Sequence, residues 1–553
     1  MPAPNLQNSM QKAMALYRAG RQEEAIADLH RAASTVRQPE VYALLARLLV
    51  DAGRVDDAIA TLHESTTVQR SAQTLSNLGL LLLRQDRSDE AIHALQDAVA
   101  IDPVFPEALS NLGAALRKVG QAGEALAVLQ RAVRLHADFG SAWTNLAGAM
   151  IDLEMFADAE RAARQATMLS SNDPVAYYNL GVALKELERL NEAVAAFERA
   201  ISLRPNYVDA LTSLGNSWHT QQKYDAAISA FRSALRTSPD DAYAQWNLSL
   251  TLLLQGEYAE AWPLYEARFR HAKHGVQQTF RQPRWDGGDL HGRRILLHCE
   301  QGLGDTLQFV RYAPLVAARG GRVMLLCQPT LSRLLQGQCE IERVTSDEQA
   351  LPAFDLQIPL LSLPLIFKTT VENIPSPKSY LKADPSLVSK WRKRLDTRPG
   401  LRIGLNWAGS PTPVSNRKRT IELAAMAPLA QVNGATFFSL QVGAAAAEAA
   451  TPPADMELVD CSPDLTDYSD TAALMSVLDV VVTCDTSIAH AAGALGIPTC
   501  VLLPSDPDWR WMLGRSDSPW YPSTRLFRQP TPGDYATPMR EVVAYLKSLR
   551  DRV

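Results

Sequence analysis

Hydrophobic and small residues recur every 34 positions through the first half of the chain. A leucine column is followed, thirteen residues later at each step, by an alanine column. The leucines are Leu78, Leu112, Leu146, Leu180, Leu214 and Leu248, and the alanines are Ala91, Ala125, Ala159, Ala193, Ala227 and Ala261. A fixed period of this length is typical of helical arrays in which each unit buries its apolar face against its neighbours. The pattern predicts about seven units over residues 8–270.

Within one unit, small residues mark where two helices meet. In the segment NEAVAAFERAISLRP, Ala193 and Ala200 let paired helices approach, while Phe197 and Ile201 fill the space between them. Glycines follow several of the leucines, and prolines close several of the units. The pattern closely resembles the tetratricopeptide repeat, and this resemblance implies a right-handed α-solenoid with a long concave face.

A column of asparagines precedes the repeat leucines. Its members are Asn77, Asn111, Asn145, Asn179 and Asn247, with Ser213 in the sixth place. A carboxamide offers two donors and an acceptor, so a ladder of them along the concave face would suit the backbone of an extended peptide. Because asparagine is common at this position of such repeats, a structural role is the alternative. Binding of a protein by the array is the broader expectation.

The second half of the chain alternates apolar runs with segments of helical period. Runs such as ILLHCE, RVMLLCQ and DVVVTCD each precede such a segment, and this alternation predicts parallel sheets covered by helices. A Gly- and Gln-rich linker is expected over 271–292, and a proline-rich break divides the rest of the chain. We therefore expect two Rossmann-like lobes, 293–385 and 386–553.

Candidate ligand-binding residues come directly after the predicted strands, where ligands of parallel α/β sheets lie. The segment NWAGSPTPVSNRKRT places Arg417, Lys418 and Arg419 beside a turn of small residues. The segment CDTSIAHAAGALGIP places Asp485 at a strand end and Ser487 at the start of a helix. Free N–H groups at a helix start, with basic side chains nearby, would suit a diphosphate.

The segment GLGDTLQFVRY contains an aspartate with two interpretations. Asp305 stands at the start of a helical pattern, where aspartate commonly caps free N–H groups. A carboxylate after a strand also suits a general base, and Gly302 and Gly304 would let an acceptor approach the backbone. His298 and Glu300, at the end of the same strand, are further candidates for the base. From these residues alone the cap is favoured.

The segment DWRWMLGRSD leaves its residues open between two roles. Trp509 and Trp511 either stack on a ligand or pack a loop over the cleft. Arg510 and Arg515 either reach a phosphate or form surface ion pairs.

Composition narrows the class of protein. The chain has 553 residues and a net charge of −5, which does not favour nucleic-acid binding. No apolar run approaches the roughly eighteen residues of a membrane span, and the N-terminus lacks a signal-peptide pattern. Six cysteines without a CxxC pair argue against a zinc or disulfide framework. Asp506 and Asp508 resemble a metal-binding pair, but a turn is the better interpretation. We expect a soluble cytoplasmic protein without a metal.

Together, GLGDTLQFVRY, the GLNWAGSP segment with its basic RKR, DTAALMSVLDVVVTCDTSIAHAAGALGIP and DWRW resemble the heptosyltransferase-like family of glycosyltransferases (family 9). The resemblance covers about residues 293–549 and is nearer to the branch fused to tetratricopeptide repeats. It implies a GT-B fold, an acceptor at the first lobe and a nucleotide sugar at the second. It also implies inversion at the anomeric carbon without a metal or other cofactor.

The resemblance also assigns residues. Asp305 matches the family's catalytic aspartate, and the loop from Ser410 to Arg419 matches its phosphate-contacting loop, with the choice among Arg417, Lys418 and Arg419 left open. The donor-binding segment is matched by Asp485, Thr486, Ser487 and His490, although His490 is equally a core residue. Because the donor would lie in the second lobe, replacement of Asp305 is expected to leave donor affinity nearly unchanged.

The resulting hypothesis is an inverting glycosyltransferase that moves a sugar from a nucleotide donor to a hydroxyl of a protein held by the repeats. Flagellins and adhesins are the first acceptors to consider. One alternative is a transferase that acts on a cell-surface glycan, with the repeats serving assembly. Another is a scaffold without catalytic activity. The sugar and the nucleotide base are not indicated by the sequence.

Overall fold

The computed structural model describes residues 6–270, 280–395, 400–409 and 419–551. The chain divides into two compact units, Met1–Gln221 and Gln222–Val553. The described part of the first unit is helical, whereas the second contains two parallel sheets.

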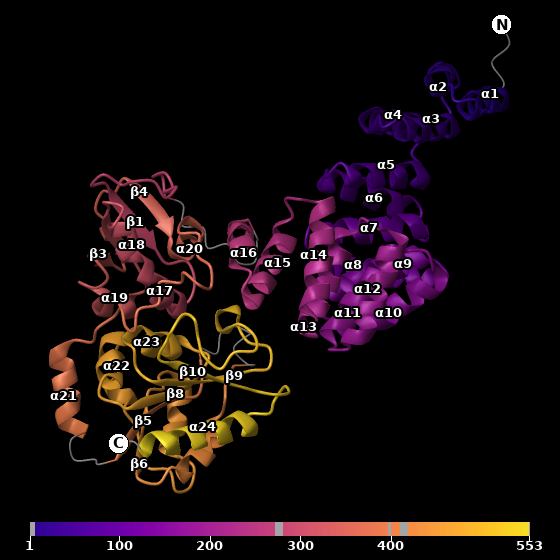
Figure 1. The fold of residues 1–553 in the computed structure, drawn as a ribbon. Coiled ribbons are helices and arrows are strands. Elements are labelled where there is room, and N and C mark those ends of the chain that lie inside the picture. Colours follow the sequence, from indigo (N-terminus) through magenta and orange to yellow (C-terminus); the bar gives the residue numbers. More distant parts are fainter. Residues whose placement is uncertain (1–5, 271–279, 396–399, 410–418, 552–553) are drawn as a thin grey trace. The chain divides into compact units, whose positions relative to one another are not determined.

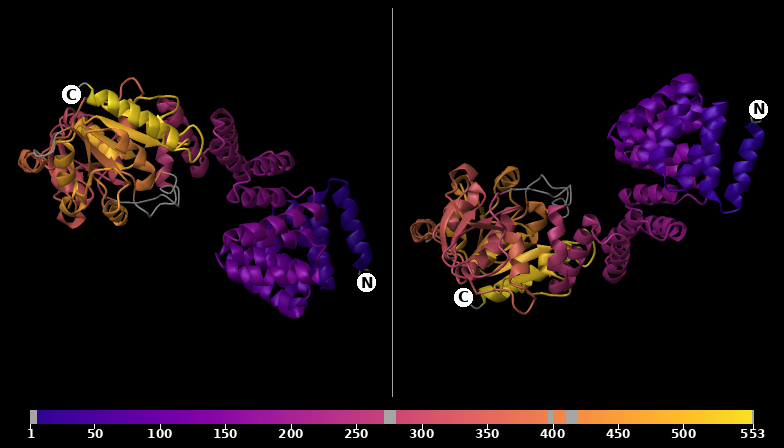
Figure 2. Two further views of the ribbon diagram at one scale, coloured as in Figure 1. Left: turned by 90° about the horizontal axis from the view of Figure 1, so that it is seen from below. Right: turned by 90° about the horizontal axis from the view of Figure 1, so that it is seen from above.

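The first unit is an array of helices joined by short turns. Its helices are α1 (Leu6–Arg18), α2 (Gln22–Val36), α3 (Pro39–Asp51), α4 (Val55–Val68), α5 (Ala72–Arg84), α6 (Ser88–Ile101), α7 (Pro106–Lys118), α8 (Ala122–Leu135), α9 (Gly140–Asp152), α10 (Phe156–Leu169), α11 (Pro174–Glu186), α12 (Leu190–Leu203) and α13 (Val208–Thr220). They pack in pairs, from α1 with α2 to α11 with α12, and successive pairs stack (Figures 1 and 2). The predicted helical solenoid is confirmed.

The small residues of the repeat set the spacing of each helix pair. At Gly113 in α7, an added Cβ would lie 2.3 Å from Cγ of Leu129 in α8. Leu129 and Ala125 are fully buried. A side chain at Gly113 would therefore force the two helices apart.

The last helices of the repeat region belong to the second unit. They are α14 (Tyr224–Thr237), α15 (Ala242–Gln255), α16 (Tyr258–Tyr265) and the 3₁₀ turn η1 (Glu266–Phe269). The ring centroid of Trp262 in α16 lies 5.6 Å from that of Trp509. Trp520 Nε1 donates a hydrogen bond to Tyr258 Oη at 3.1 Å. Because α16 packs on residues so far along the chain, the compact division falls before the predicted solenoid end at residue 270.

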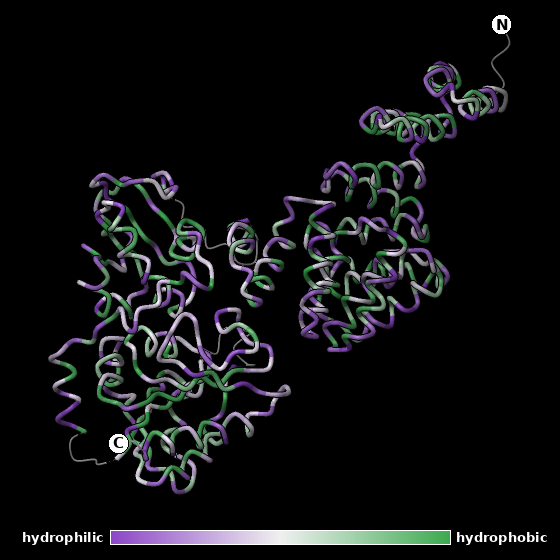
Figure 3. The backbone as a smooth tube through the Cα atoms, viewed as in Figure 1, coloured by the Kyte–Doolittle hydropathy of each residue, from purple (hydrophilic) through white to green (hydrophobic). Residues whose placement is uncertain are grey.

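The first sheet has four parallel strands in the order β3-β2-β1-β4. The strands are β1 (Arg294–His298), β2 (Arg322–Leu326), β3 (Ile341–Thr345) and β4 (Leu356–Pro359). The helical segments between the strands are α17 (Leu303–Phe309), η2 (Val310–Tyr312), α18 (Ala313–Ala317), α19 (Pro329–Leu335) and η3 (Glu348–Ala350), and η4 (Leu360–Ser362) and α20 (Leu363–Ile366) follow β4. Strand β1 is apolar through its middle (Figure 3), and Ile295, Leu296 and Leu297 are fully buried.

The predicted linker contributes to this sheet at its end. Residues 271–279 lie outside the described part of the chain. Arg284 forms a parallel β-bridge with Gln357, and Trp285 N–H donates to the Gln357 carbonyl at 2.9 Å. The segment therefore extends the sheet beyond β4.

The second sheet has six parallel strands in the order β10-β9-β8-β5-β6-β7. The strands are β5 (Leu401–Asn406), β6 (Ala435–Ser439), β7 (Leu458–Val459), β8 (Val480–Cys484), β9 (Thr499–Leu503) and β10 (Thr524–Arg528). The helical segments are α21 (Pro385–Leu395), η6 (Leu423–Gln431), η7 (Ala444–Ala450), η8 (Ser462–Asp464), α22 (Tyr468–Met475), α23 (Ser487–Leu495), η9 (Trp509–Trp511) and α24 (Ala536–Arg550).

This strand order has a functional consequence. The chain builds outward from β5 in one direction and then outward from β8 in the other. Ile403 of β5 lies opposite Val480 of β8, so the two starting strands are neighbours. That is the doubly wound order, in which a ligand crevice opens at the carboxyl ends of the two central strands. The prediction of parallel sheets is confirmed.

Candidate functional site

The carboxyl ends of β5 and β8 carry two buried polar residues, Asn406 and Asp485. Asn406 Oδ1 accepts from Thr483 Oγ1 at 3.0 Å and from Thr486 Oγ1 at 2.7 Å. Its amide nitrogen donates to Gln441 Oε1 at 2.8 Å. These bonds tie the start of α23 to the end of β5.

Asp485 ends β8 in a buried position. Trp511 Nε1 donates to its Oδ1 at 2.8 Å, and Arg419 Nη1 lies 3.3 Å from its Oδ2. Burial raises the pKa of Asp485, and the positive charge of Arg419 opposes that rise. The predicted donor-site aspartate is thus paired with the one member of the basic trio that the structure describes.

Asp508 shares two arginines. Arg510 Nη1 lies 2.8 Å from Asp508 Oδ1, and Arg419 Nη2 lies 3.2 Å from Asp508 Oδ2. Burial acts to raise the pKa of Asp508, but the two guanidinium groups lower it overall. Asp508 also caps η9 by accepting from the Arg510 backbone N–H at 3.0 Å. The predicted turn role is present, and an electrostatic role accompanies it.

Asp305 contacts both lobes through its two oxygens. Its Oδ2 accepts from the Gly302 backbone N–H at 2.8 Å. Gly302 is the N-cap of α17 and Asp305 is the third residue of that helix, so Asp305 makes the return contact of a capping box, whereas one interpretation of the sequence made it the cap itself. Its Oδ1 forms an ion pair with Arg510 Nη2. The second contact makes Asp305 a neighbour of the charged residues after β8 and β9, whereas the sequence placed it apart from them.

Gly304 in α17 packs closely against His490 in α23. A Cβ at Gly304 would lie 2.6 Å from His490 Cδ2, so the glycine lets α17 approach α23. His490 Nδ1 is 2.8 Å from Tyr521 Oη, and its ring stacks on Trp511 with centroids 5.4 Å apart. Burial is the main cause that lowers the pKa of His490, to about 3. The imidazole is therefore neutral and packed at neutral pH.

The two reserve candidates for the base have internal partners. His298 Nε2 is 3.0 Å from Gln357 Oε1, and burial lowers the pKa of His298 to about 4. Glu300 Oε1 lies 2.9 Å from Arg268 Nη2. Burial raises the pKa of Glu300, and Arg268 opposes that rise.

Of the other residues predicted to bind the donor, the structure describes Thr486 and Ser487. Thr486 is the N-cap of α23 and accepts from the Ile488 N–H at 3.3 Å. Ser487 Oγ accepts from Tyr468 Oη. Ser410, Arg417 and Lys418 lie outside the described residues.

The asparagine column contacts preceding repeats over three steps. Asn179 Nδ2 donates to the Thr144 carbonyl at 2.9 Å, and Asn145 Nδ2 donates to Ser110 Oγ at 3.0 Å. Asn111 makes the equivalent bond to Ser76 Oγ at 3.3 Å.

The two end members of the column differ from these three. Asn77 accepts from Gln73 at 3.2 Å, whereas Asn247 donates within its own helix, to Tyr243. Three of the five asparagines therefore use part of their hydrogen-bonding capacity to join successive repeats, which leaves less of it for the predicted binding of a peptide.

Arg268 is a buried residue that the sequence reasoning missed. Its side chain is 2% exposed and pairs with Glu266 at 2.6 Å as well as with Glu300. A signal was available: Arg268 stands at a position where five preceding repeats have alanine, namely Ala98, Ala132, Ala166, Ala200 and Ala234. A charged side chain in a buried column of small residues indicates that this helix faces something other than another repeat.

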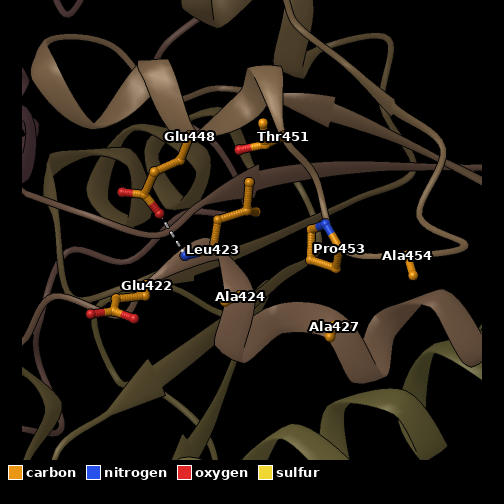
Figure 4. Close-up of a pocket in the computed structure, with 8 residues that line it drawn as sticks. All are labelled: Glu422, Leu423, Ala424, Ala427, Glu448, Thr451, Pro453 and Ala454. Atoms are coloured by element: carbon orange, nitrogen blue, oxygen red, sulfur yellow. Dashed lines mark hydrogen bonds between the residues drawn. The ribbon is translucent and has the colours of Figure 1, made fainter.

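A surface hollow of about 640 Å³ lies beside the six-stranded sheet (Figure 4). It is lined by residues of η6 and η7 with their flanking segments, and Glu448 accepts from the Leu423 N–H at 2.9 Å. None of its lining residues belongs to the charged group around Arg510.

Neither a membrane-spanning helix nor a cluster of metal-ligating side chains is present among the described residues. None of their helices combines the length and apolar character needed to cross a membrane. Among the same residues, no three His, Cys, Asp or Glu side chains are grouped as a metal site.

Comparison with known families assigns the repeats. Residues 76–138, 145–208, 178–242 and 212–270 match one model of the tetratricopeptide repeat, and residues 39–64 match another. The predicted tetratricopeptide repeats are therefore confirmed, and they supply a class of surface that binds proteins.

One curated relative is Protein FlbA of Caulobacter vibrioides. It is 28% identical over 335 residues, which cover 55% of this chain and 56% of the relative. The chain thus spans little more than half of that protein's length.

Solved structures with similarity include the APC/C hetero-tetramer Cut9–Hcn1. It has a TM-score of 0.40 and 19% identity, over 48% of this chain and 53% of that one. A tetratricopeptide repeat protein from Parabacteroides merdae has a TM-score of 0.38 and 16% identity, over 44% and 98%. The repeat assignment rests on the family models.

Proposed function

We propose that the second unit is an inverting glycosyltransferase of GT-B type that transfers a sugar from a nucleotide donor to a protein bound by the repeats. The observation that carries the proposal is the series of ion pairs that links Asp305 to Asp485, the residue after β8, through Arg510, Asp508 and Arg419. The doubly wound order supplies a crevice at the carboxyl ends of β5 and β8. The ion pair with Arg510 brings a carboxylate from the other sheet to its edge.

The proposed reaction uses these groups in distinct roles. An acceptor hydroxyl attacks the anomeric carbon while its proton passes to the Asp305 carboxylate, and the bond to the nucleoside diphosphate breaks. General-base help of this kind contributes about 10²–10⁴ in rate. The charge that develops on the leaving diphosphate is met by Arg419 and Arg510, because fixed cations in a buried site stabilise it.

The repeats support a protein acceptor. Arrays of this class bind proteins, and flagellins and adhesins are the first acceptors to test. No metal or other cofactor enters the proposed reaction.

The proposal is tested by monitoring nucleoside diphosphate release from a panel of nucleotide sugars, with and without candidate acceptors. The full chain should release diphosphate from one donor and add the matching mass to an acceptor. Asp305→Asn should bind that donor but turn it over roughly 10²–10⁴ times more slowly. Turnover at the normal rate in a folded Asp305→Asn protein would remove Asp305 as the base.

A further inference from the structure

Arg510 connects the two sheets through a chain of alternating charges. Its side chain is 9% exposed and contacts Asp305, Asp508 and the amide oxygen of Gln308, the last at 2.9 Å. Its guanidinium carbon lies 4.3 Å from the centroid of the Trp509 ring. A stacked guanidinium keeps its plane while its edges remain available to carboxylates or phosphates.

The charges around Arg510 do not balance. Asp305, Asp508 and Asp485 are three carboxylates, and the described residues supply them with two guanidinium groups, those of Arg510 and Arg419. Asp508 already has both arginines as partners. It therefore keeps a cation when one arginine changes partner.

We propose that Arg510 is an anion-binding residue whose place is taken by Asp305 until a diphosphate arrives. This inference rests on the proposed function and adds to it a competition between two anions for one guanidinium. Carboxylates and phosphates offer the same paired acceptors to an arginine, so one can replace the other. Arrival of the donor thereby frees Asp305 Oδ1 for the acceptor hydroxyl.

The geometry keeps Asp305 in place after Arg510 leaves it. Its Oδ2 is held by the Gly302 backbone N–H, a contact that does not involve Arg510. The freed carboxylate therefore stays at the start of α17, beside Gly304 and His490. Binding of the donor therefore also frees the Asp305 carboxylate to act as the base.

A competition of this kind makes an unusual prediction. Asp305→Asn removes the internal competitor while keeping the size of the side chain, so an anion should bind more tightly. Coupling between sites in proteins is typically about 5–150-fold, and we expect a gain of about 5-fold or more. The sequence alone predicted nearly unchanged affinity.

The experiment is titration calorimetry of the full chain with inorganic pyrophosphate at constant ionic strength. The variants are Asp305→Asn, Arg510→Gln and the double variant. Asp305→Asn should tighten binding, and Arg510→Gln should weaken it. The gain from Asp305→Asn should disappear in the double variant, because it acts through Arg510.

Arg515 supplies a matched control in the same loop. It pairs with the exposed Asp517 at 2.8 Å, so Arg515→Gln and Asp517→Asn should leave pyrophosphate affinity unchanged. If Arg510→Gln fails to fold, Arg510→Lys keeps the charge but loses the paired geometry. In the Arg510→Lys background, Asp305→Asn should then tighten pyrophosphate binding by less than it does in the unaltered chain.

Three results would overturn the inference. They are unchanged or weaker binding in folded Asp305→Asn, a gain that persists without Arg510, and no pyrophosphate binding in any variant. The same measurements distinguish failure of this inference from failure of the proposed transferase function. A gain that depends on Arg510, without turnover of any nucleotide sugar, would keep the anion site and remove the transferase. Turnover without the gain would remove only the competition.

Discussion

The repeat array and the sheet unit use polar residues in different ways. In the array, Asn145 and Asn179 bond to residues 35 positions earlier, one repeat away. In the sheet unit, Arg510 pairs with Asp305 across 205 positions. The first kind of contact recurs with the repeat, whereas the second occurs once and joins segments that no period relates. We therefore expect substitutions in the array to have small, repeated effects and those in the sheet unit to have large, individual ones.

The largest stability effect should come from Arg268. Arg268→Met leaves the buried Glu300 without its cation, whereas Glu266 keeps Arg284 as a partner. Breaking a buried ion pair from one side typically costs about 3–5 kcal/mol. Denaturant unfolding monitored by tryptophan fluorescence would measure the loss.

The array offers a control for this prediction. Arg117 pairs with Asp152 at 2.7 Å in a half-exposed position, and Arg117→Met should shift unfolding much less. Equal shifts for the two variants would contradict the distinction between the regions.

A second prediction concerns Gly304. Gly304→Ala places a methyl group 2.6 Å from His490 Cδ2, and overpacking of this kind typically costs about 1–3 kcal/mol. Gly302→Ala is the matched control, because its Cβ would meet only the Asp305 carboxylate, at 3.3 Å. Thermal unfolding of both variants would check it, and a similar melting temperature for the two would show that α17 and α23 are not tightly packed.

Sequence reasoning recovered what repeats and alternates. The 34-residue period revealed the paired helices, and the alternation of apolar runs with helical segments predicted the parallel sheets. It also placed Asp485 correctly at a strand end. It could not join Asp305 to Arg510, because each residue alone suits a cap or a surface ion pair. Arg268 could have been noticed from its own segment, but nothing there specifies Glu300 as its partner.

A third prediction rests on the pKa of His490, which burial lowers to about 3. The unfolded histidine has a pKa near 6.5, so below that pH the unfolded chain binds the additional proton and stability falls. The loss from this residue should reach about 2 kcal/mol at pH 5. His490→Gln should flatten the fall between pH 7.5 and pH 5, and His298, shifted in the same direction, should retain part of it. An identical pH profile in the variant would contradict the burial of a neutral imidazole.

The smallest effects should come from the asparagine column. Asn111→Ala and Asn145→Ala each remove a hydrogen bond to the preceding repeat, which is typically worth about 1 kcal/mol. Asn247→Ala is the control, because it removes a hydrogen bond within one helix and none between repeats. If the same changes leave stability intact but weaken acceptor binding, the column serves a peptide and the structural interpretation fails.

If the carboxyl ends of β5 and β8 hold the diphosphate of a nucleotide sugar, calorimetric titration of the full chain should detect the binding. The titrants are nucleoside diphosphates and their sugars, measured on the unaltered chain and on Asp485→Asn and Ser487→Ala. We predict saturable binding of one nucleotide class, weakened by both substitutions because Asp485 follows β8 and Ser487 begins α23. Failure of every nucleotide to bind the folded protein, or unchanged affinity in both variants, would show that this edge of the sheet is not a nucleotide-sugar site.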